Sequence, residues 1–435
     1  MRILFVQPNP RSKNKKDKST SPLSNRIISK FSVFSPQLTF PMLAAVTPKE
    51  HKIEIINERY KQLDYRNKYD IVGISFRTFE AKRAYEIADK FRKRGNKVVL
   101  GGWHVSALPE EAKEHADSVV VGEAEELWPQ LLNDLNNGGM KPFYIQQKAV
   151  DPTLLCSPTK INLRGHLESV QATRGCPNGC HFCSIYNTKF RNIYRKRPIE
   201  NVIEEIENLP SKSFSFLDAS LTIDVKYSKE LFKSMIGLNK KFGCSGNVNR
   251  LCKDEELLKL AYEAGCMQWL IGFESVTQES LDGIGKKTNK VEMYKSVIKK
   301  IHDYGMTIKG EFIFGFDNDK PDVFEKTLEM LNKMDIDMMD FYILTPYPGT
   351  PLYNNIVNEK RLLTKDWSKY DCKNVVFQPK NMAPEELLEG TKYVGRQIHS
   401  YSNIVRRYFS NVKRNYALWT VIQNFSNRNY FKKFT

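Results

Sequence analysis

The chain has 435 residues, of which 41% are hydrophobic and 27% are charged, and its formal net charge is +17. This composition excludes a disordered or fibrous protein, and the length predicts more than one domain. No stretch approaches the ~20 apolar residues of a membrane span, and no signal peptide is recognisable, so we expect a cytoplasmic protein. The positive charge favours an anionic partner or surface, although a lysine-rich proteome would give the same balance.

Residues 1–140 are predicted to form a doubly wound, Rossmann-like α/β domain. Short runs rich in Val and Ile alternate with segments of helical periodicity, which is typical of a parallel sheet with helices on both faces. The runs are MRILFVQ, KIEIINE, DIVGISF, KVVLGG and SVVVGE. Ligands of such domains bind at the carboxyl ends of the strands. Residues 9–36 follow the first strand, and we expect them to form a long loop near that edge.

A second alternation of strands and helices follows a linker, which we assign to residues 141–168. Six strand candidates between residues 169 and 380 predict a partial (β/α)6 barrel with its chemistry at the strand carboxyl ends. They are ESVQATRG, SFSFLDAS, CSGNVNR, QWLIGFES, IKGEFIFGF and DFYILTPYP. Residues 381–435 are predicted to form a helical C-terminal region.

Three of the eight cysteines lie close together in the stretch TRGCPNGCHFC, directly after the first predicted barrel strand. Three residues separate Cys176 from Cys180, and two separate Cys180 from Cys183, while Gly175 and Gly179 let the loop turn tightly. Such thiolates favour zinc, copper(I) or an iron–sulfur centre. Structural zinc normally has four ligands, so three thiols fit better a cluster with one open iron. Three unrelated core thiols are not expected in a loop that contains Gly and Pro.

The CxxxCxxC motif at this place resembles that of the radical S-adenosylmethionine (SAM) superfamily, over about residues 169–380. The resemblance implies that Cys176, Cys180 and Cys183 hold a 4Fe–4S cluster whose open iron binds SAM. It also implies reductive cleavage of SAM to a 5′-deoxyadenosyl radical, with an electron donor such as flavodoxin or ferredoxin.

Positions around the first three barrel strands match SAM-binding positions of the family. Phe182 matches an aromatic residue whose backbone contacts adenine, and Asp218 ends the second strand, where the family binds the SAM amino group. Asn247 and Arg250 end the third strand, where polar residues meet the SAM carboxylate or ribose. An ordinary hydrogen-bonded strand end would explain each of these polar residues equally well.

The later strands carry further matches. The stretch GFES is similar to a Gly-x-Glu-Ser element and places Glu274 and Ser275 near the ribose. The stretch FIFGF resembles the fifth strand of the family and points to Ile313 and Gly315 as neighbours of adenine. TPYPGTPLY (345–353) is similar to the sixth-strand signature of the same subgroup.

The N-terminal domain resembles the cobalamin-binding domain of the largest radical SAM subgroup, through residues 101–126 and the stretch GISFRT. The resemblance implies the cobalamin contacts Ser75, Thr78, Gly101, Gly102 and His104. The Asp-x-His-x-x-Gly motif of classical cobalamin domains is absent, since the corresponding edge reads INERYKQLD. Two explanations are open. Either the chain provides no His ligand to the lower face of the cobalt, or the domain has lost cobalamin. Methylthiotransferases, which have three cysteines in their N-terminal domain, are excluded because residues 1–155 contain none.

These resemblances together imply a cobalamin-dependent radical SAM enzyme similar to the class B methyltransferases. The expected reaction is methylation of an unactivated carbon of a lipid or small natural product, with SAM as radical source and methyl donor. One alternative is a cyclase or rearrangement enzyme without methyl transfer. The other is a non-catalytic iron–sulfur or cobalamin sensor. No catalytic residue beyond the cofactor contacts is predicted.

Residues 391–435 contain nine Lys or Arg, ten aromatic residues and no Asp or Glu. Three interpretations are open: a helical lid over the barrel mouth, peripheral contact with an anionic membrane surface, and binding of single-stranded nucleic acid. Nucleic acid is the least favoured of the three.

Overall fold

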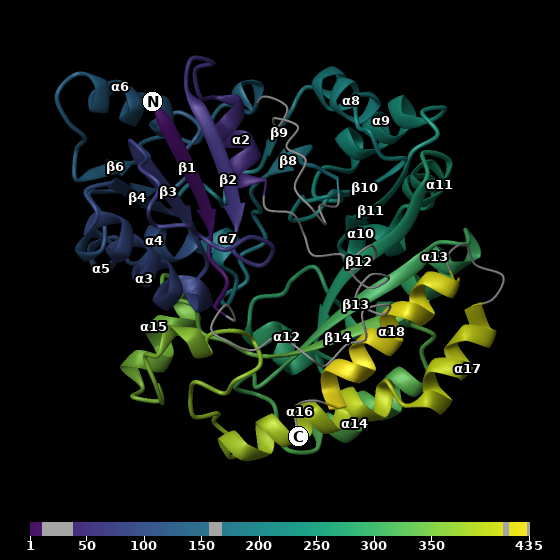
Figure 1. Ribbon diagram of the computed structural model, residues 1–435. Coiled ribbons are helices and arrows are strands. Elements are labelled where there is room, and N and C mark those ends of the chain that lie inside the picture. The colour runs from purple at the N-terminus through teal and green to yellow at the C-terminus, as the bar shows by residue number, and fades with distance from the viewer. Residues whose placement is uncertain (11–37, 156–167, 412–416, 433–435) are drawn as a thin grey trace.

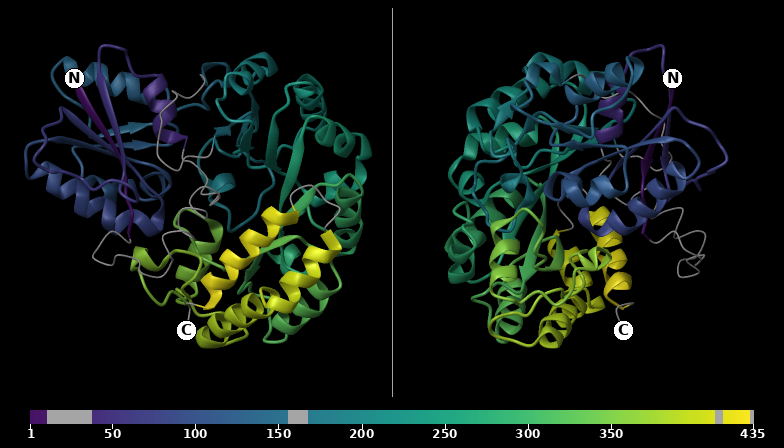
Figure 2. Two further views of the ribbon diagram at one scale, coloured as in Figure 1. Left: turned by 45° about the vertical axis from the view of Figure 1, so that its right-hand side comes forward. Right: turned by 90° about the vertical axis from the view of Figure 1, so that its left-hand side faces the viewer.

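The computed structural model describes residues 1–10, 38–155, 168–411 and 417–432 (Figure 1). Two six-stranded sheets organise it, one in each half of the molecule. The two further views in Figure 2 show the two halves lying side by side, with the C-terminal helices packed on the second half. The two-domain α/β architecture expected from the sequence is confirmed.

The first sheet has the order β2-β1-β3-β4-β5-β6 and is parallel throughout. Its strands are β1 (Arg2–Gln7), β2 (Lys52–Asn57), β3 (Ile71–Ser75), β4 (Lys97–Gly101), β5 (Ser118–Val121) and β6 (Phe143–Ile145). One face packs on α3 (Ala81–Arg92), α4 (Trp103–Ala107) and α5 (Pro109–Glu114), and the other on α2 (Thr39–Ala45) and α6 (Leu127–Asn136). Both faces are therefore buried, which explains the uninterrupted apolar runs of these strands.

The first sheet extends further along the chain than predicted. β6 pairs in parallel with β5, yet it lies within the range 141–168 that the sequence analysis assigns to a linker. The strand has three residues, of which only Tyr144 is buried, so it has no periodicity to detect. The predicted loop falls outside the described residues from residue 11 to 36, as does the linker from residue 156 to 167.

The second sheet has the order β14-β13-β12-β11-β10-β7, is also parallel, and is left open between its first and last strands. The strands are β7 (Ser169–Val170), β10 (Ser213–Phe216), β11 (Lys241–Ser245), β12 (Cys266–Glu274), β13 (Thr307–Phe314) and β14 (Met338–Ile343). The helices α8 (Ile199–Glu207), α9 (Val225–Met235), α11 (Glu255–Glu263), α13 (Tyr294–Asp303) and α14 (Val323–Asn332) cover its outer face. The six predicted strands thus form the predicted partial barrel.

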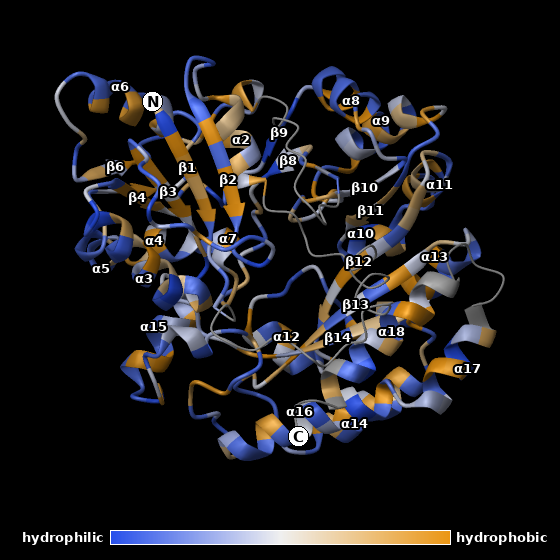
Figure 3. Ribbon diagram, in the orientation of Figure 1, coloured by the Kyte–Doolittle hydropathy of each residue, from blue (hydrophilic) through white to orange (hydrophobic). Residues whose placement is uncertain are grey.

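Hydropathy follows this arrangement. The strands of both sheets carry many hydrophobic residues, whereas hydrophilic and hydrophobic residues alternate along the helices (Figure 3). In β13, Ile308, Phe312 and Phe314 belong to the core against the helices. Because side chains alternate along a strand, Lys309 and Glu311 lie on the opposite, barrel-interior face.

The C-terminal region is helical, as predicted, and consists of α16 (Pro384–Ile398), α17 (Tyr401–Asn411) and α18 (Ala417–Lys432). α16 packs on α14 and β14. The side-chain amide of Asn424 donates to the carbonyl of Asp337 at 2.9 Å, and that of Asn427 to the carbonyl of Met339 at 3.2 Å. These contacts place α18 on the edge strand β14, while the lid interpretation stays a prediction. Among the described residues, no helix has the length and apolarity needed to cross a membrane.

Candidate active site between the two domains

The three clustered cysteines lie in a tight loop between β8 (Thr173–Arg174) and the short helix α7 (Ser184–Asn187). Gly175 and Gly179 both adopt positive φ, +91° and +75°, which glycine tolerates best. A Cβ atom on Gly175 would lie 2.1 Å from the carbonyl oxygen of Ile193, so the loop packs directly on the segment that follows α7. The amide of Cys176 donates to the carbonyl of Arg191 at 2.9 Å, which holds the loop there.

Burial disfavours the charged forms of two thiols of this loop, Cys176 and Cys180. Burial raises the pKa of Cys180 to about 12 and also raises that of Cys176, and the nearby Cys183 thiolate acts in the same direction. A bound cationic centre would offset this cost, because metal binding and thiol deprotonation are coupled. No three His, Cys, Asp or Glu side chains converge on a single ion within the described ranges. A 4Fe–4S cluster binds each thiolate through a different iron, so three thiols spread along one loop fit it.

Glu274 and Lys286 form a buried ion pair beside this loop. Glu274 ends β12 with φ +64°, and its Oε1 lies 2.7 Å from Nζ of Lys286. Burial lowers the pKa of Lys286, but the carboxylate of Glu274 and the thiolate of Cys180 outweigh it and the pKa is raised. A Cβ atom on Gly272 would lie 2.4 Å from Oε1 of Glu274, so this glycine makes room for the carboxylate. Ser275, the next predicted residue, is buried with its Oγ 3.1 Å from Oγ1 of Thr277.

Asp218, predicted to meet the SAM amino group, forms hydrogen bonds within the protein in this structure. Its carboxylate accepts hydrogen bonds from the Thr173 amide, from the Thr173 hydroxyl at 2.6 Å and from the Ala172 amide at 3.3 Å. Burial raises the pKa of Asp218 to about 6, although the bonds from Thr173 oppose this. In this structure the residue braces the chain that leads into the cysteine loop.

The other predicted SAM residues lie at or near the carboxyl ends of their strands. Asn247 precedes the short helix α10 (Val248–Lys253), within which Arg250 is exposed. The ring of Phe182 lies 6.1 Å from that of Phe316, while Ile313 is half-buried on β13.

Backbone conformation and packing both require a glycine at position 315. It adopts φ +105°, and a Cβ atom there would lie 2.8 Å from Cδ2 of Leu387 in α16. Asp319, which sequence reasoning missed, accepts hydrogen bonds from the Gly315 amide at 2.9 Å and from the Ser280 hydroxyl at 2.6 Å. The C-terminal region therefore covers the turn after β13.

The barrel interior holds polar side chains that the sequence analysis did not single out. Lys309 on β13 lies 2.8 Å from Asp340 on β14, and the Tyr342 hydroxyl donates to Asp340 at 3.3 Å. Burial raises the pKa of Glu311 to about 7, against the effect of Lys309. Strict alternation in IKGEFIF and MDFYI would have placed these residues on one face.

A cavity of about 250 Å³ lies between the two domains. The end of α4, the carboxyl ends of β5 and β6, the helix α7 and the turn before α15 (Pro351–Asn358) surround it. Its lining residues are Ser106, Ala107, Val121, Gly122, Ile145, Gln146, Ser184, Asn187, Thr188, Lys189, Pro348, Gly349 and Thr350. On the side of the first domain three lining residues are small, Ser106, Ala107 and Gly122, so a flat ligand can approach the backbone there. The strand-end rule, applied to SVVVGE, would have indicated Gly122.

The five residues predicted to contact cobalamin lie at the same edge of the first sheet but do not line this cavity. Ser75 and Thr78 are buried. Gly101 ends β4, and Gly102 follows with φ +105°. A Cβ atom on Gly102 would lie 2.6 Å from the carbonyl oxygen of Phe76, so close packing on the turn after β3 requires this glycine.

His104 is fully buried and connects the two domains. Its Nε2 lies 3.2 Å from Oε1 of Glu111, which also accepts a hydrogen bond from Nε1 of Trp367 at 2.9 Å. Trp367 belongs to the second half of the chain, and its ring centroid lies 5.3 Å from that of His104. Within the described part of the chain, Nδ1 of His104 has no hydrogen-bond partner.

Comparison with known proteins agrees with this architecture. The family models described as B12 binding domain and Radical SAM superfamily match residues 48–132 and 170–331. The chain is 33% identical over 391 residues to bacteriochlorophyllide d C-12(1)-methyltransferase of Chlorobaculum tepidum, covering 86% of this chain and 84% of that protein. The chain belongs to the cobalamin-dependent radical SAM methyltransferases. A second relative, bacteriochlorophyllide d C-8(2)-methyltransferase of the same organism, is 34% identical over 79% of this chain and 81% of that protein.

A solved structure shows the same fold. The radical SAM methyltransferase TsrM from Kitasatospora setae, with cobalamin and a [4Fe-4S] cluster bound, superimposes with a TM-score of 0.71. The match covers 99% of both chains at 15% identity. As a cobalamin-dependent radical SAM methyltransferase, the protein is an enzyme that uses a 4Fe–4S cluster, SAM and cobalamin. The non-catalytic sensor is thereby set aside.

Proposed function

We propose that this methyltransferase transfers a methyl group to an unactivated carbon of a lipid or small natural product at the junction of its two domains. The observation that carries the proposal is the shared cavity, because the strand ends of the first domain and the helix after the cysteine loop line it together. When bound, the cluster and SAM supply a 5′-deoxyadenosyl radical and cobalamin supplies the methyl group.

The chain's own residues would hold and enclose these groups. Cys176, Cys180 and Cys183 would bind the cluster, and the Glu274–Lys286 pair lies within electrostatic reach of the thiols. SAM would lie along the barrel strand ends, near Phe182, Asn247, Arg250, Ser275, Ile313 and Gly315. Asp218 would act there by bracing the loop and not by direct contact.

Cobalamin would bind at the strand ends of the first domain, above Gly101 and Gly122. Four residues would support that edge by packing behind it and not by lining the cavity: Ser75, Thr78, Gly102 and His104. The cavity is smaller than the ~300–1,000 Å³ of ordinary small-ligand sites, and a corrinoid is larger than most ligands of such sites. Side chains of α7 and its neighbours must therefore move when cobalamin enters.

The substrate would lie in the barrel, against the interior face of β13 and β14. The two relatives described above are named for a bacteriochlorophyllide. Lys309, Glu311, Asp340 and Tyr342 give this chain polar anchors in the same interior. An apolar substrate with at least one polar group fits that arrangement.

The experiment is anaerobic reconstitution with iron, sulfide and hydroxocobalamin, followed by incubation with a reductant, methyl-deuterated SAM and small-molecule extracts. A product heavier by one deuterated methyl group in place of hydrogen, together with 5′-deoxyadenosine, is expected. A product of unchanged carbon count would indicate the cyclase or rearrangement alternative. The triple variant with Ala at the three cysteines should lose the cluster absorbance, and retention of four irons there would contradict the ligand assignment.

We also propose two partners. A flavodoxin or ferredoxin would donate the electron, and the net charge of +17 supports docking of an acidic carrier. The exposed face of α17 would contact an anionic membrane surface. Tyr401, Val405 and Phe409 follow one another at four-residue spacing with exposed fractions of 58%, 48% and 69%, and no acidic residue occurs after residue 390.

A further inference from the structure

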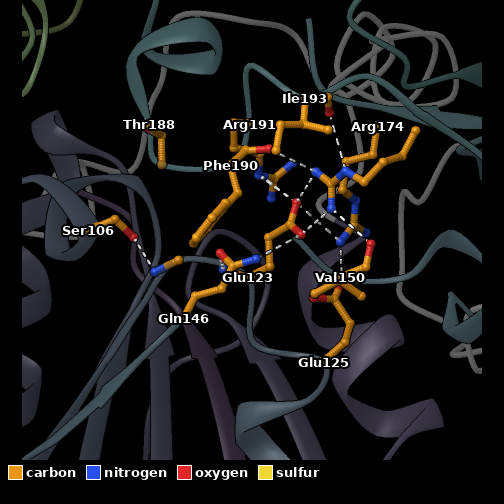
Figure 4. A network of polar contacts seen from close by, with 12 residues as sticks. Ser106, Glu123, Glu125, Gln146, Val150, Arg174, Thr188, Phe190, Arg191 and Ile193 are labelled. Atoms are coloured by element: carbon orange, nitrogen blue, oxygen red, sulfur yellow. Dashed lines mark hydrogen bonds and ion pairs between the residues drawn. The ribbon is translucent and has the colours of Figure 1, made fainter. Parts of the chain in front are cut away.

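Two carboxylates of the first domain, the buried Glu123 and the partly buried Glu125, lie among three arginines of the second (Figure 4). Glu123 is the second residue after the end of β5, next to Gly122, and it is buried. Its two oxygens accept hydrogen bonds from Arg195 at 2.6 and 2.9 Å, and Oε1 also lies 3.0 Å from Nε of Arg191 and 3.7 Å from Nη1 of Arg174. Arg174 donates to Glu125 at 2.6 Å. The surrounding guanidinium groups prevail over burial and lower the pKa of Glu123 to about 2.

The first domain also fixes Glu123 from its own side. The Glu123 amide donates to Oε1 of Gln146 at 2.9 Å, and the Gln146 amide donates back to Oε2 at 3.3 Å. Gln146 directly follows β6, and its amide also bonds the carbonyl of Lys148 at 2.9 Å. These contacts within the first domain therefore help to orient the carboxylate, in addition to the arginines.

The three arginines belong to the two chain segments that shape the cysteine loop. Arg174 is the residue before Gly175, where the loop begins. Arg191 accepts the amide hydrogen of Cys176 with its backbone carbonyl and reaches Glu123 with its side chain. Its guanidinium also lies 5.1 Å from the centre of the Trp103 ring at the start of α4.

The same strand end therefore serves two purposes. Gly122 lines the cavity assigned above to cobalamin, and the next residue holds the cysteine loop. We propose that Glu123 is a positioning residue that sets the cluster loop at a fixed place relative to the cobalamin edge, acting through Arg174, Arg191 and Arg195. This inference rests on the proposed cofactor sites, since it concerns the distance between them.

The charges of the network indicate which variant to test. Three guanidinium groups face two carboxylates, and burial together with the neighbouring Arg174 lowers the pKa of Arg191 to about 10. Arg191→Met leaves two arginines with two carboxylates, so its charges balance. Glu123→Gln leaves three guanidinium groups with one carboxylate, and such a buried imbalance can prevent folding. Arg191→Met is therefore the first variant, and its backbone carbonyl is retained.

The measurement is made on the reconstituted holoenzyme, without substrate. Dipolar electron paramagnetic resonance gives the distance between cob(II)alamin and the reduced cluster. The wild type should give one narrow distance, and Arg191→Met a displaced or broadened one. The matched control is Arg83→Met, which removes a similarly buried arginine paired with Glu58 inside the first domain. It should leave the distance unchanged.

Hydrogen–deuterium exchange of the peptide that contains Cys176 provides a second readout, which does not need cobalamin. We expect exchange to be faster by about tenfold in Arg191→Met, the effect of losing one charge-assisted hydrogen bond, and unchanged in Arg83→Met. An Arg191→Met protein with wild-type distance and exchange would overturn the proposal.

The double variant Glu123→Gln/Arg191→Met adds a further test wherever Glu123→Gln folds. Its exchange should resemble that of the single variants, because both substitutions break the same connection. Fully additive effects would contradict the proposal. Wild-type protein that binds no cobalamin or no cluster would instead contradict the proposed cofactor sites, and the exchange comparison would still test the positioning role.

Discussion

The ammonium group of Lys286 lies 2.7 Å from Oε1 of Glu274, at the point where β12 ends beside the cysteine loop. Glu274 holds this place with a left-handed backbone, which is costly for a residue with a side chain. Strain of this kind persists where the surrounding structure enforces it, and it is common at functional sites. We therefore assign the Glu274–Lys286 pair to the candidate active site.

Lys286→Met should destabilise the protein by about 3 kcal/mol, because it leaves the buried carboxylate of Glu274 without its partner. SAM cleavage under reductant should fall as well, since the positive charge nearest the thiols is lost. Chemical denaturation and 5′-deoxyadenosine formation measure the two effects. Lys287→Met is the control, because Lys287 is the exposed neighbour. Equal behaviour of the two variants would contradict a role for the ion pair.

Gly272→Ala should impair SAM cleavage in the same direction while costing only about 1 kcal/mol of stability. The added Cβ atom would lie 2.4 Å from Oε1 of Glu274, so the carboxylate must turn away from Lys286. The control is Gly243→Ala in β11, where the nearest atom to a Cβ is 3.6 Å away. Unaltered SAM cleavage in Gly272→Ala would show that the carboxylate position does not matter.

Asp218 predicts a pH dependence of stability. Burial raises its pKa from 3.8 to about 6 in the folded protein, so folding favours the protonated carboxyl. Its contribution to stability is fully present below about pH 4 and is lost as the pH rises through about 6. The unfolding free energy of the wild type, minus that of Asp218→Asn, should fall by on the order of 2–3 kcal/mol between pH 4 and pH 7. A difference that stays constant over this range would refute the assignment.

The α17 surface predicts lipid binding that depends on apolar side chains. Val405→Ser and Phe409→Ser together should reduce sedimentation with phosphatidylglycerol vesicles by about tenfold or more, since two exposed apolar groups are removed. Leu363→Ser is the control, because Leu363 is 52% exposed elsewhere on the surface. If the double variant still binds the vesicles, or if the wild-type protein does not bind them, the α17 surface is excluded as a membrane contact.

Much of the architecture was predictable because buried parallel strands have strong apolar runs. The six barrel strands and five of the six strands of the first sheet were identified in this way, whereas β6 was too short. The cysteine loop was recognisable from spacing and its two glycines. Asp218 and Gly315 were assigned to SAM by resemblance alone, and this assignment stays a prediction. What the resemblance did not indicate is their place in the packing, where Asp218 bonds Thr173 and Gly315 lies against Leu387.

The missed residues share a physical reason. Lys286 and Asp319 lie in loops without periodicity. Their side-chain partners, Glu274 and Ser280, are 12 and 39 residues away in the sequence. Glu123 was visible within VGEAEE, but its three arginines lie about 50 to 70 residues further along the chain. Only the packing of the two domains brings such charges together, and no local pattern records it.

The buried Glu123 network also bears on how the two domains evolve. A substitution at Glu123 leaves three arginines of the other domain without their main counter-charge. A first domain with a neutral residue at this position would likewise leave these charges uncompensated, which is destabilising. Neither domain is then free to be exchanged for an unrelated copy by recombination. Among homologues, we expect positions 123, 174, 191 and 195 to change together, so that the cobalamin-binding and radical SAM halves are inherited as a matched pair.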